Sequence, residues 1–261
     1  MTSKLEHAAV RLLAAPDDTA ARLGLFEALA ESECILMLDH EPDGAQLSPT
    51  VFALEGGSVV LAFDSDDKLA GFAGRPVPYA ALSGRALAGM LAASGTGLGL
   101  NLGSDAELLL SAAELRWFAE LLDQRATEHL RRPVRFGPPA LAAGAVAALT
   151  RKLAGAPGLA ERALLAGAEF EDGDSGAFLA IVGARPGAEP ALAGAINEAL
   201  AFNGDAAPTL DIAYLDPADP LLAPLMDAAH VIDIPAPVAA PAKVASPAAP
   251  GMDPDKPPRL R

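Results

Sequence analysis

The sequence predicts an α+β protein with two α/β layer domains, each a mixed sheet with helices packed on it, followed by a disordered Pro/Ala-rich tail. A chain of 261 residues is long enough for two domains of ordinary size. Hydrophobic residues make up 51% of the chain but aromatic residues only 5%, which favours aliphatic cores formed by helices on a sheet. Segments with helical spacing also alternate with short apolar runs that are typical of strands.

The clearest local pattern is VFALEGGSVVLAFDSDDKL, residues 51–69. Two apolar runs, 51–54 and 58–63, flank a Gly-Gly pair that can supply the positive φ angles of a tight turn, so we expect a β-hairpin. The second run is apolar without alternation, which is typical of a central strand covered on both faces. Asp64-Ser65 then predicts the N-terminus of a helix, because short oxygen-bearing side chains accept hydrogen bonds from its first N–H groups.

Two helices and a strand are predicted before this hairpin. Apolar residues between positions 5 and 13 recur at i, i+3, i+4 and i+7 and form one stripe on a helix that Pro16 ends. Residues 17–19, Asp-Asp-Thr, cap a second helix, and we expect the two helices to pack antiparallel. The run CILML at 34–38 follows as a short strand.

The predicted first domain continues with shorter elements. Proline on both sides of Val77 limits VPYA to an edge strand, because proline cannot donate to a sheet ladder. Ser83 caps the next helix. The run LGLNLGSD, residues 98–105, places glycines on one face of a strand, which indicates that a backbone or helix packs closely there. A strand at 108–110 and a helix capped by Ser111 complete the domain.

The second predicted domain has the order helix, hairpin, helix, strand, short helix, strand. Its hairpin has the loop EDGDSG between two apolar runs. In the same order, the predicted elements are 140–153, 163–170 with 177–182, 192–200, 210–214, 221–226 and 231–234.

The predicted domain limits follow shifts in composition. The first domain spans 1–125, the second spans 138–235, and the tail spans 236–261, where Pro and Ala dominate and little can be buried. The stretch between the domains is rich in charge and proline, which marks a linker. We expect its basic residues to be solvated: Arg131, Arg132 and Arg135.

Charge and cysteine usage limit the possible partners. The formal charge of -15 and the pI near 4.6 oppose binding to nucleic acid or anionic membranes, since such binding depends on Lys and Arg. The chain has no export signal and no apolar run long enough to cross a bilayer, so we expect a soluble, cytoplasmic protein. A single cysteine, Cys34, excludes an internal disulfide and lies in an apolar strand, where we expect a buried and unreactive thiol.

The sequence offers no catalytic, cofactor or metal motif. The histidines at 7, 40, 129 and 230 lack HxxxH or HExxH spacing, and neither a P-loop nor a GxSxG elbow occurs. The run SGTGLGLNLG lacks the third glycine of a dinucleotide fingerprint and follows a helix instead of a strand. Acidic residues near 64–67 fit helix capping better than metal binding, and those at 172 and 174 fit a solvated hairpin tip. We therefore expect no enzyme, no cofactor and no metal.

The order of three segments resembles the SseB family, the bacterial enhanced-serine-sensitivity proteins. The segments are LEHAAVRLLAAPDDTAARLGLFEALAESECILML, VFALEGGSVVLAFDSDDKLAGF and the glycine-rich LGLNLGSD before a closing helix. The likeness covers 5–122 well and 140–235 only in layout. It implies a cytoplasmic accessory α+β protein connected with serine sensitivity or with amino-acid and sulfur metabolism, without a catalytic motif to carry across.

The functional hypothesis is a non-catalytic protein that acts by binding another protein. Polar groups cluster after strand ends in the first domain, so we expect the partner surface near Asn101, Gly103 and Ser104, beside the end of strand 59–63. A plain turn is the alternative for these three residues. The alternative function is a small-molecule or amino-acid binding protein, or a weak enzyme, with a pocket between the domains.

Overall fold

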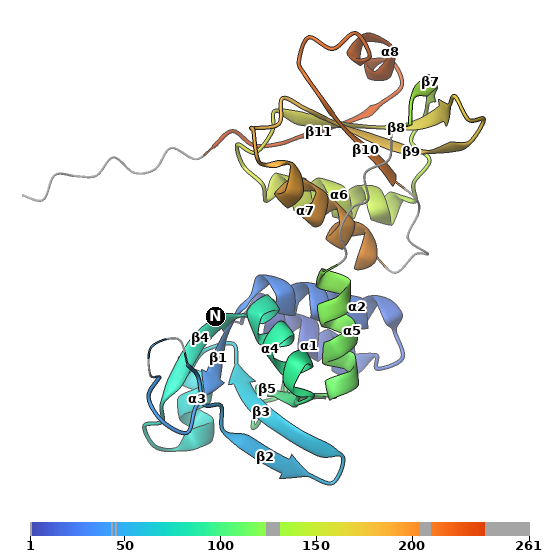
Figure 1. Cartoon of the computed structure of the whole chain (residues 1–261). Coiled ribbons are helices and arrows are strands. Elements are labelled where there is room, and N and C mark those ends of the chain that lie inside the picture. Colours follow the sequence, from blue (N-terminus) through green and yellow to red (C-terminus); the bar gives the residue numbers. More distant parts are fainter. Residues whose placement is uncertain (1, 43, 45, 124–130, 204–209, 238–261) are drawn as a thin grey trace, which may run out of the picture.

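The computed structural model describes residues 2–42, 44, 46–123, 131–203 and 210–237 (Figure 1). It contains two mixed sheets, one in residues 2–123, the first domain, and one in residues 131–237, the second domain. The helical layers of the two domains face each other, and the two sheets lie on the outside (Figure 1). The predicted α+β layer class is confirmed.

The first sheet has the strand order β4-β1-β3-β5-β6, and β2 pairs with β3 beside this path. Only β3 and β5 pair in parallel, with Val60 opposite Leu98; the other pairs are antiparallel. The strands are β1 (Glu33–Met37), β2 (Val51–Leu54), β3 (Gly57–Phe63), β4 (Tyr79–Ser83), β5 (Gly97–Leu100) and β6 (Leu108–Leu110).

Strand β3 lies at the centre of this sheet, as its unalternating sequence predicts. Its last five residues are buried, and they divide between two cores. Val60 and Ala62 belong to the larger core under the helices, whereas Val59, Leu61 and Phe63 belong to a smaller core on the other face. The hairpin with β2 is also confirmed, although only Gly57 of its glycine pair has a positive φ, 138°.

Five helices pack on the first sheet: α1 (Lys4–Ala14), α2 (Thr19–Glu31), α3 (Asp66–Ala73), α4 (Gly84–Ser94) and α5 (Ala112–Leu122). The predicted helix N-caps are present. The side chains of four residues each accept a hydrogen bond from a backbone N–H in the first turn of the following helix: Asp18, Ser65, Ser83 and Ser111. Helices α1, α2, α4 and α5 cover one face, and α3 packs against the other. The two sheet faces are therefore covered to very different extents.

The second domain repeats this layout. Its sheet has the order β10-β9-β8-β11, with β7 also paired to β8, and β9 and β10 run in parallel. Two helices pack on one face and a short one on the other. The elements are β7 (Pro133–Gly137), α6 (Ala143–Ala154), β8 (Arg162–Phe170), β9 (Ser175–Val182), α7 (Glu189–Ala201), β10 (Leu210–Leu215), α8 (Leu222–Met226) and β11 (His230–Asp233).

The basic cluster is held against the second domain instead of lying in a linker, so that part of the prediction was wrong, although Arg132 and Arg135 are exposed as predicted. Strand β7 belongs to the second sheet, so the domain begins before the predicted residue 138. Arg131 pairs with Asp172, Asp174 and Asp211 at 3.1 to 3.2 Å, and its guanidinium lies 4.0 Å from the centre of the Phe170 ring. Arg131 is held against the second domain by these residues, which are distant in sequence and which local sequence patterns do not reveal.

The described part of the chain contains no helix long and apolar enough to span a membrane. Most of the predicted tail, residues 238–261, lies outside the described residues. Residues up to Pro237 are described, and the backbone N–H of Gly158 donates to Pro235 O at 2.8 Å, which holds the end of this segment against the second domain.

Candidate functional site

Two polar side chains lie side by side where the parallel strands β3 and β5 end. Asp64 follows β3 and Asn101 follows β5. The carboxyl ends of parallel strands are where α/β sheets commonly place functional groups. The backbone N–H of Asp64 donates to Oδ1 of Asn101 at 2.9 Å, so the amide side chain ties the two strand ends together.

The carboxylate of Asp64 is almost fully enclosed and is bound by neighbours from two helices. Lys68, on α3, lies 2.8 Å from one carboxylate oxygen, and the hydroxyl of Ser3, the N-cap of α1, donates to the other. Lys68 also pairs with Glu6 at 2.9 Å. Burial would raise the pKa of Asp64, but hydrogen bonds from Lys68 and Ser3 outweigh it and lower that pKa.

Asn101 has a local conformation that only a few residue types adopt readily. Its φ is +52°, and it is the only non-glycine residue in the described segments with a positive φ. Its side chain is fully buried, and Nδ2 has no hydrogen-bond partner of ordinary geometry, although the amide is close enough to lower the pKa of Asp64. Asn101 therefore holds the turn and does not itself reach the surface.

The other two residues of the predicted partner surface are more accessible. Gly103 is exposed, has a φ of +82° and donates its N–H to Glu107 at 2.9 Å. Ser104 is half-buried, and its hydroxyl donates to Asn101 O at 2.8 Å. The three residues form a tight turn, as the alternative interpretation expected, and only Gly103 of the three presents an open surface.

The face of the first sheet beside this turn is thinly covered, and we call it the open face. Leu109 is 58% exposed and stands opposite Gly99, which itself stands opposite Leu61. Phe72, on α3, is 41% exposed and its ring centre lies 5.5 Å from that of Phe63. The open face consists of Phe52, Leu54, Val59, Leu61, Phe63, Phe72, Leu102 and Leu109.

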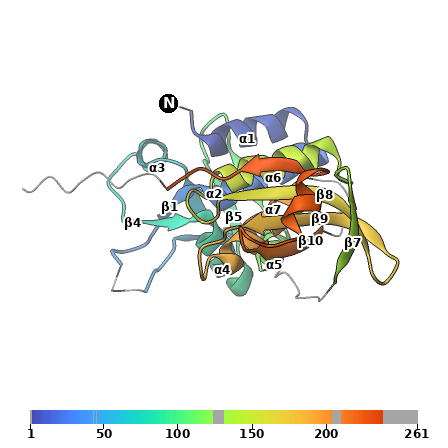
Figure 2. The same ribbon diagram turned by 90° about the horizontal axis from the view of Figure 1, so that it is seen from above.

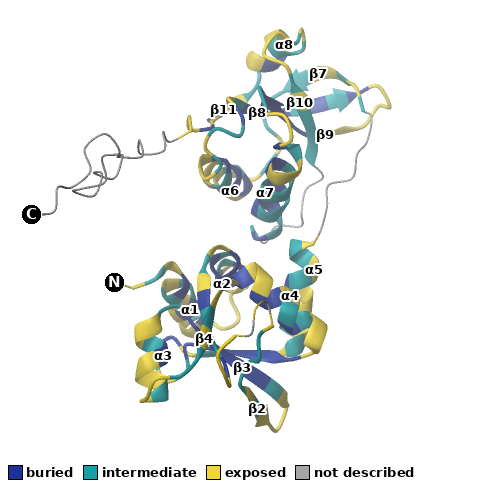
Figure 3. Cartoon of the chain, turned by 60° about the vertical axis from the view of Figure 1, so that its left-hand side comes forward, coloured by how far each residue is buried: buried dark blue, intermediate teal, exposed yellow. Residues whose placement is uncertain are grey.

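Two glycines of β5 let neighbouring groups pack closely against the sheet at the centre of the open face. A side chain at Gly99 would place Cβ 2.6 Å from Leu61 Cδ2, and one at Gly97 would lie 2.8 Å from Leu110 O. The close approach that the sequence predicts therefore exists, and the neighbours are strand β6 and the side chains of the open face. Figure 3 shows the buried β3 beneath this face and exposed residues on α3.

Four acidic residues border the open face on the side of the turn. Asp66 and Asp67 lie in the first turn of α3, and Asp105 and Glu107 lie in the segment that leads to β6. All four are exposed, and none makes an ion pair with a described residue. The open face is thus apolar at its centre and negative at this border.

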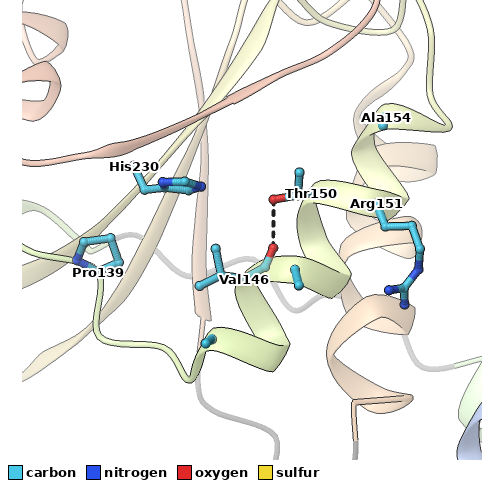
Figure 4. A pocket seen from close by; sticks show the side chains of 8 residues that line it. Pro139, Val146, Thr150, Arg151, Ala154 and His230 are labelled. Carbon is cyan, nitrogen blue, oxygen red and sulfur yellow. Dashed lines mark hydrogen bonds between the residues drawn. The ribbon is translucent and has the colours of Figure 1, made fainter.

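A concave surface lies on the other domain, along α6 (Figure 4). This shallow groove has a volume of about 710 Å³ and a mostly aliphatic lining, with His230 and Arg151 among its polar groups. The hydroxyl of Thr150 points to its own helix and donates to Val146 O at 2.8 Å. The groove is lined by Pro139, Ala143, Val146, Ala147, Thr150, Arg151, Ala154 and His230.

Two other side chains considered for chemistry, Cys34 and Arg131, are buried or already paired. Cys34 is fully buried, and burial, with the charges of Asp64 and Glu33, raises the pKa of its thiol to about 12. The predicted burial of this thiol is confirmed, and its lack of reactivity stays a prediction. Arg131 binds the acidic loop at Asp172 and Asp174. Within the described segments, no group of three or more His, Cys, Asp or Glu side chains is arranged to hold a metal ion.

Comparison with known proteins agrees with this fold. Residues 5–117 match the family model described as the SseB protein N-terminal domain. The match runs from α1 into α5 and so includes the whole first sheet and the Asp64–Asn101 junction. No curated protein and no solved structure gave a significant match. The likeness of 140–235 to the family's C-terminal domain stays a prediction. Over residues 5–117, the first domain of this chain is similar to the N-terminal domain of the SseB family.

Proposed function

We propose that this protein is a non-catalytic, cytoplasmic accessory protein that binds another protein through the open face of its first domain. The observation that carries this proposal is the exposure of large apolar side chains on a sheet face that a single short helix covers. Phe72, Leu109 and Leu54 are 41%, 58% and 48% exposed and surround the smaller core of this domain. Exposed apolar side chains bordered by polar residues are typical of protein interaction sites.

The charge of the border indicates what the partner carries. Asp66, Asp67, Asp105 and Glu107 have no described cationic partner, and the whole chain has a formal charge of -15. A partner segment that combines apolar residues with Lys or Arg would complement both the centre and the border of the open face. A phosphate backbone would be repelled by the same charges, which argues against nucleic acid.

The side chains best placed for chemistry support a structural role instead. The carboxylate of Asp64 is bound by Lys68 and Ser3, so it lies in an ion pair instead of facing an open space. Asn101 contributes its oxygen to the backbone of Asp64. We infer that these groups fix the shape of the open face, and that the connection with serine sensitivity arises through the bound partner.

Substitution of the open face tests this proposal. We expect affinity-tagged wild-type protein to capture a partner from cells of its source, and the purified partner to bind it in isothermal titration. The double substitution Phe72→Asp, Leu109→Asp should reduce that affinity at least tenfold, because it places charge in the apolar centre. Val231→Asp, at a side chain 42% exposed in the second domain, is the matched control and should bind normally.

Both variants need an unchanged fold, which circular dichroism and thermal unfolding establish. If the double variant binds the partner as tightly as the wild type while Val231→Asp weakens binding, the open face is not the site and the second domain is.

The alternative function, binding of an amino acid or another small molecule, is favoured by the groove along α6. Arg151 could attract a carboxylate, and the aliphatic lining could accept an apolar side chain. A rise in the unfolding temperature on adding serine or a related amino acid, abolished by Val146→Asp, would support it over protein binding. An unchanged unfolding temperature up to millimolar concentrations would reject it.

A further inference from the structure

The second domain inserts an aromatic side chain into the core of the first. Phe202, at the C-terminal end of α7, is only 6% exposed and belongs to the core cluster that contains Phe26 and Phe118. Its ring centre lies 6.3 Å from that of Phe118, which in turn lies 5.0 Å from Phe26. Figures 1 and 2 show α7 lying over the helices of the first domain. Phe202 thus fills an aromatic site that the first domain provides.

Three ion pairs cross between the domains around this contact. Arg85 of α4 binds Glu198 of α7 through both terminal guanidinium nitrogens, Nη1 and Nη2. Lys152 of α6 lies 2.7 Å from Glu31 of α2. The third pair joins Arg151 to Glu27 of α2 at 3.1 Å.

The charges form one chain, because Lys152 also lies 3.3 Å from Glu198 and Glu31 also pairs with Lys4. An apolar anchor enclosed by polar pairs is the usual arrangement of a protein interface. Here both partners belong to the same chain. The anchor is a single phenylalanine. The pairs around it are partly accessible, because the side chains of Arg151 and Arg85 are 58% and 41% exposed, whereas those of Lys152 and Glu198 are 12% and 11% exposed. Exposed ion pairs contribute little each and weaken with salt.

We propose that Phe202 is a removable intramolecular plug, and that the site beneath it accepts a phenylalanine-bearing helix of a partner once the ion pairs around it are broken. The chemistry of the occupant is that of α7 itself: an aromatic side chain at a helix end, preceded by an acidic residue that faces Arg85. Because Phe202 is tethered, it competes at a high effective concentration, so the closed chain should reject such a partner. This site lies on the helical side of the first domain and is independent of the open face.

A labelled peptide tests the proposal on the full chain. The probe is a fluorescein-labelled peptide of residues 189–203, EPALAGAINEALAFN, whose binding is followed by fluorescence polarisation. We expect the Phe202→Ala chain to bind it at least tenfold more tightly than the wild type, because the plug is absent. A peptide with alanine at the position of Phe202 should fail to compete. Phe136→Ala, which removes a phenylalanine from the other face of the second domain, should bind the probe like the wild type.

A charge exchange tests the ion pairs without removing the anchor. Arg151→Glu places two acids together and should raise probe binding about twofold to fivefold, the range that loss of an exposed pair allows. Arg151→Glu combined with Glu27→Arg should return binding to the wild-type value. Equal binding of both peptides, or equal binding by the Phe202→Ala and wild-type chains, would overturn the proposal. If Phe202→Ala does not fold, the charge-exchange series decides by the same criterion.

Discussion

The backbone N–H of Asp64 donates to Oδ1 of Asn101 at 2.9 Å, which joins the ends of the two parallel strands β3 and β5. The bond depends on a residue that is buried, carries an amide and tolerates a φ of +52°. Asparagine meets all three requirements, since it enters the left-handed region more readily than most residues and keeps a hydrogen-bonding side chain. The open face begins at this junction.

Replacing Asn101 should therefore destabilise the first domain. We expect Asn101→Ala to lower the free energy of unfolding by about 1–3 kcal/mol, because the partly buried N–H of Asp64 loses its acceptor. Asn101→Gly should cost less than alanine, since glycine removes the strain of the positive φ. Urea unfolding followed by circular dichroism measures both. Equal stability of the alanine variant and the wild type would show that the bond has no structural role.

The ion pair of Asp64 with Lys68 predicts how stability depends on pH. The pKa of this carboxyl is lowered in the folded protein, so its contribution is present above the unfolded value of about 4 and is lost as pH falls through the folded value. We expect Asp64→Asn to be less stable than the wild type at pH 7 and to differ less from it at pH 3. Unfolding curves across this range test the prediction, and a constant difference between the two proteins would contradict it.

Two glycines of the same helix should respond in opposite ways to alanine. A Cβ at Gly84, at the start of α4, would lie 1.8 Å from the carbonyl oxygen of Leu29, so Gly84→Ala must push α4 away from α2. We expect a loss of at least about 2 kcal/mol. Gly89, in the middle of α4, has nothing within 4 Å, and Gly89→Ala should stabilise the protein by about 0.5–1 kcal/mol. Thermal unfolding of the pair provides the check, which fails if both changes have the same sign.

The thiol of Cys34 should be unreactive in the folded chain. Its pKa is raised to about 12, so almost no thiolate exists at pH 8, and the side chain has no exposed surface. We expect iodoacetamide to label it only in denaturant, as mass spectrometry would show. Rapid labelling of the native protein would mean that β1 opens frequently.

Much of this fold follows from local sequence. Capping and burial produce patterns within a few residues of sequence. The helices could therefore be predicted from their caps at Asp18, Ser83 and Ser111, and β3 from its unalternating apolar run. The sequence of strand β7 contains no such local pattern. It begins with proline and contains Arg135, whose partner Glu169 is distant in sequence, so its composition resembles a linker.

The candidate site could also be predicted from the sequence only in part. Polar residues after strand ends predicted that Asn101 lies beside the end of β3, but not that Asn101 would be buried and bonded to Asp64. The contribution of Phe72 and Leu109 to one face depends on strand pairing between distant segments, which sequence alone does not give. Exposed apolar residues look like core residues until the sheet is assembled.

The most direct test of protein binding at the open face is site-specific photo-crosslinking in cells. A photoreactive phenylalanine analogue is placed at position 109 of the open face or, as the control, at position 231 of the second domain. We expect one discrete crosslinked species from position 109, containing a protein with a basic and apolar segment, and none from position 231. Crosslinks from position 231 alone, or identical crosslinks from both, would contradict the account.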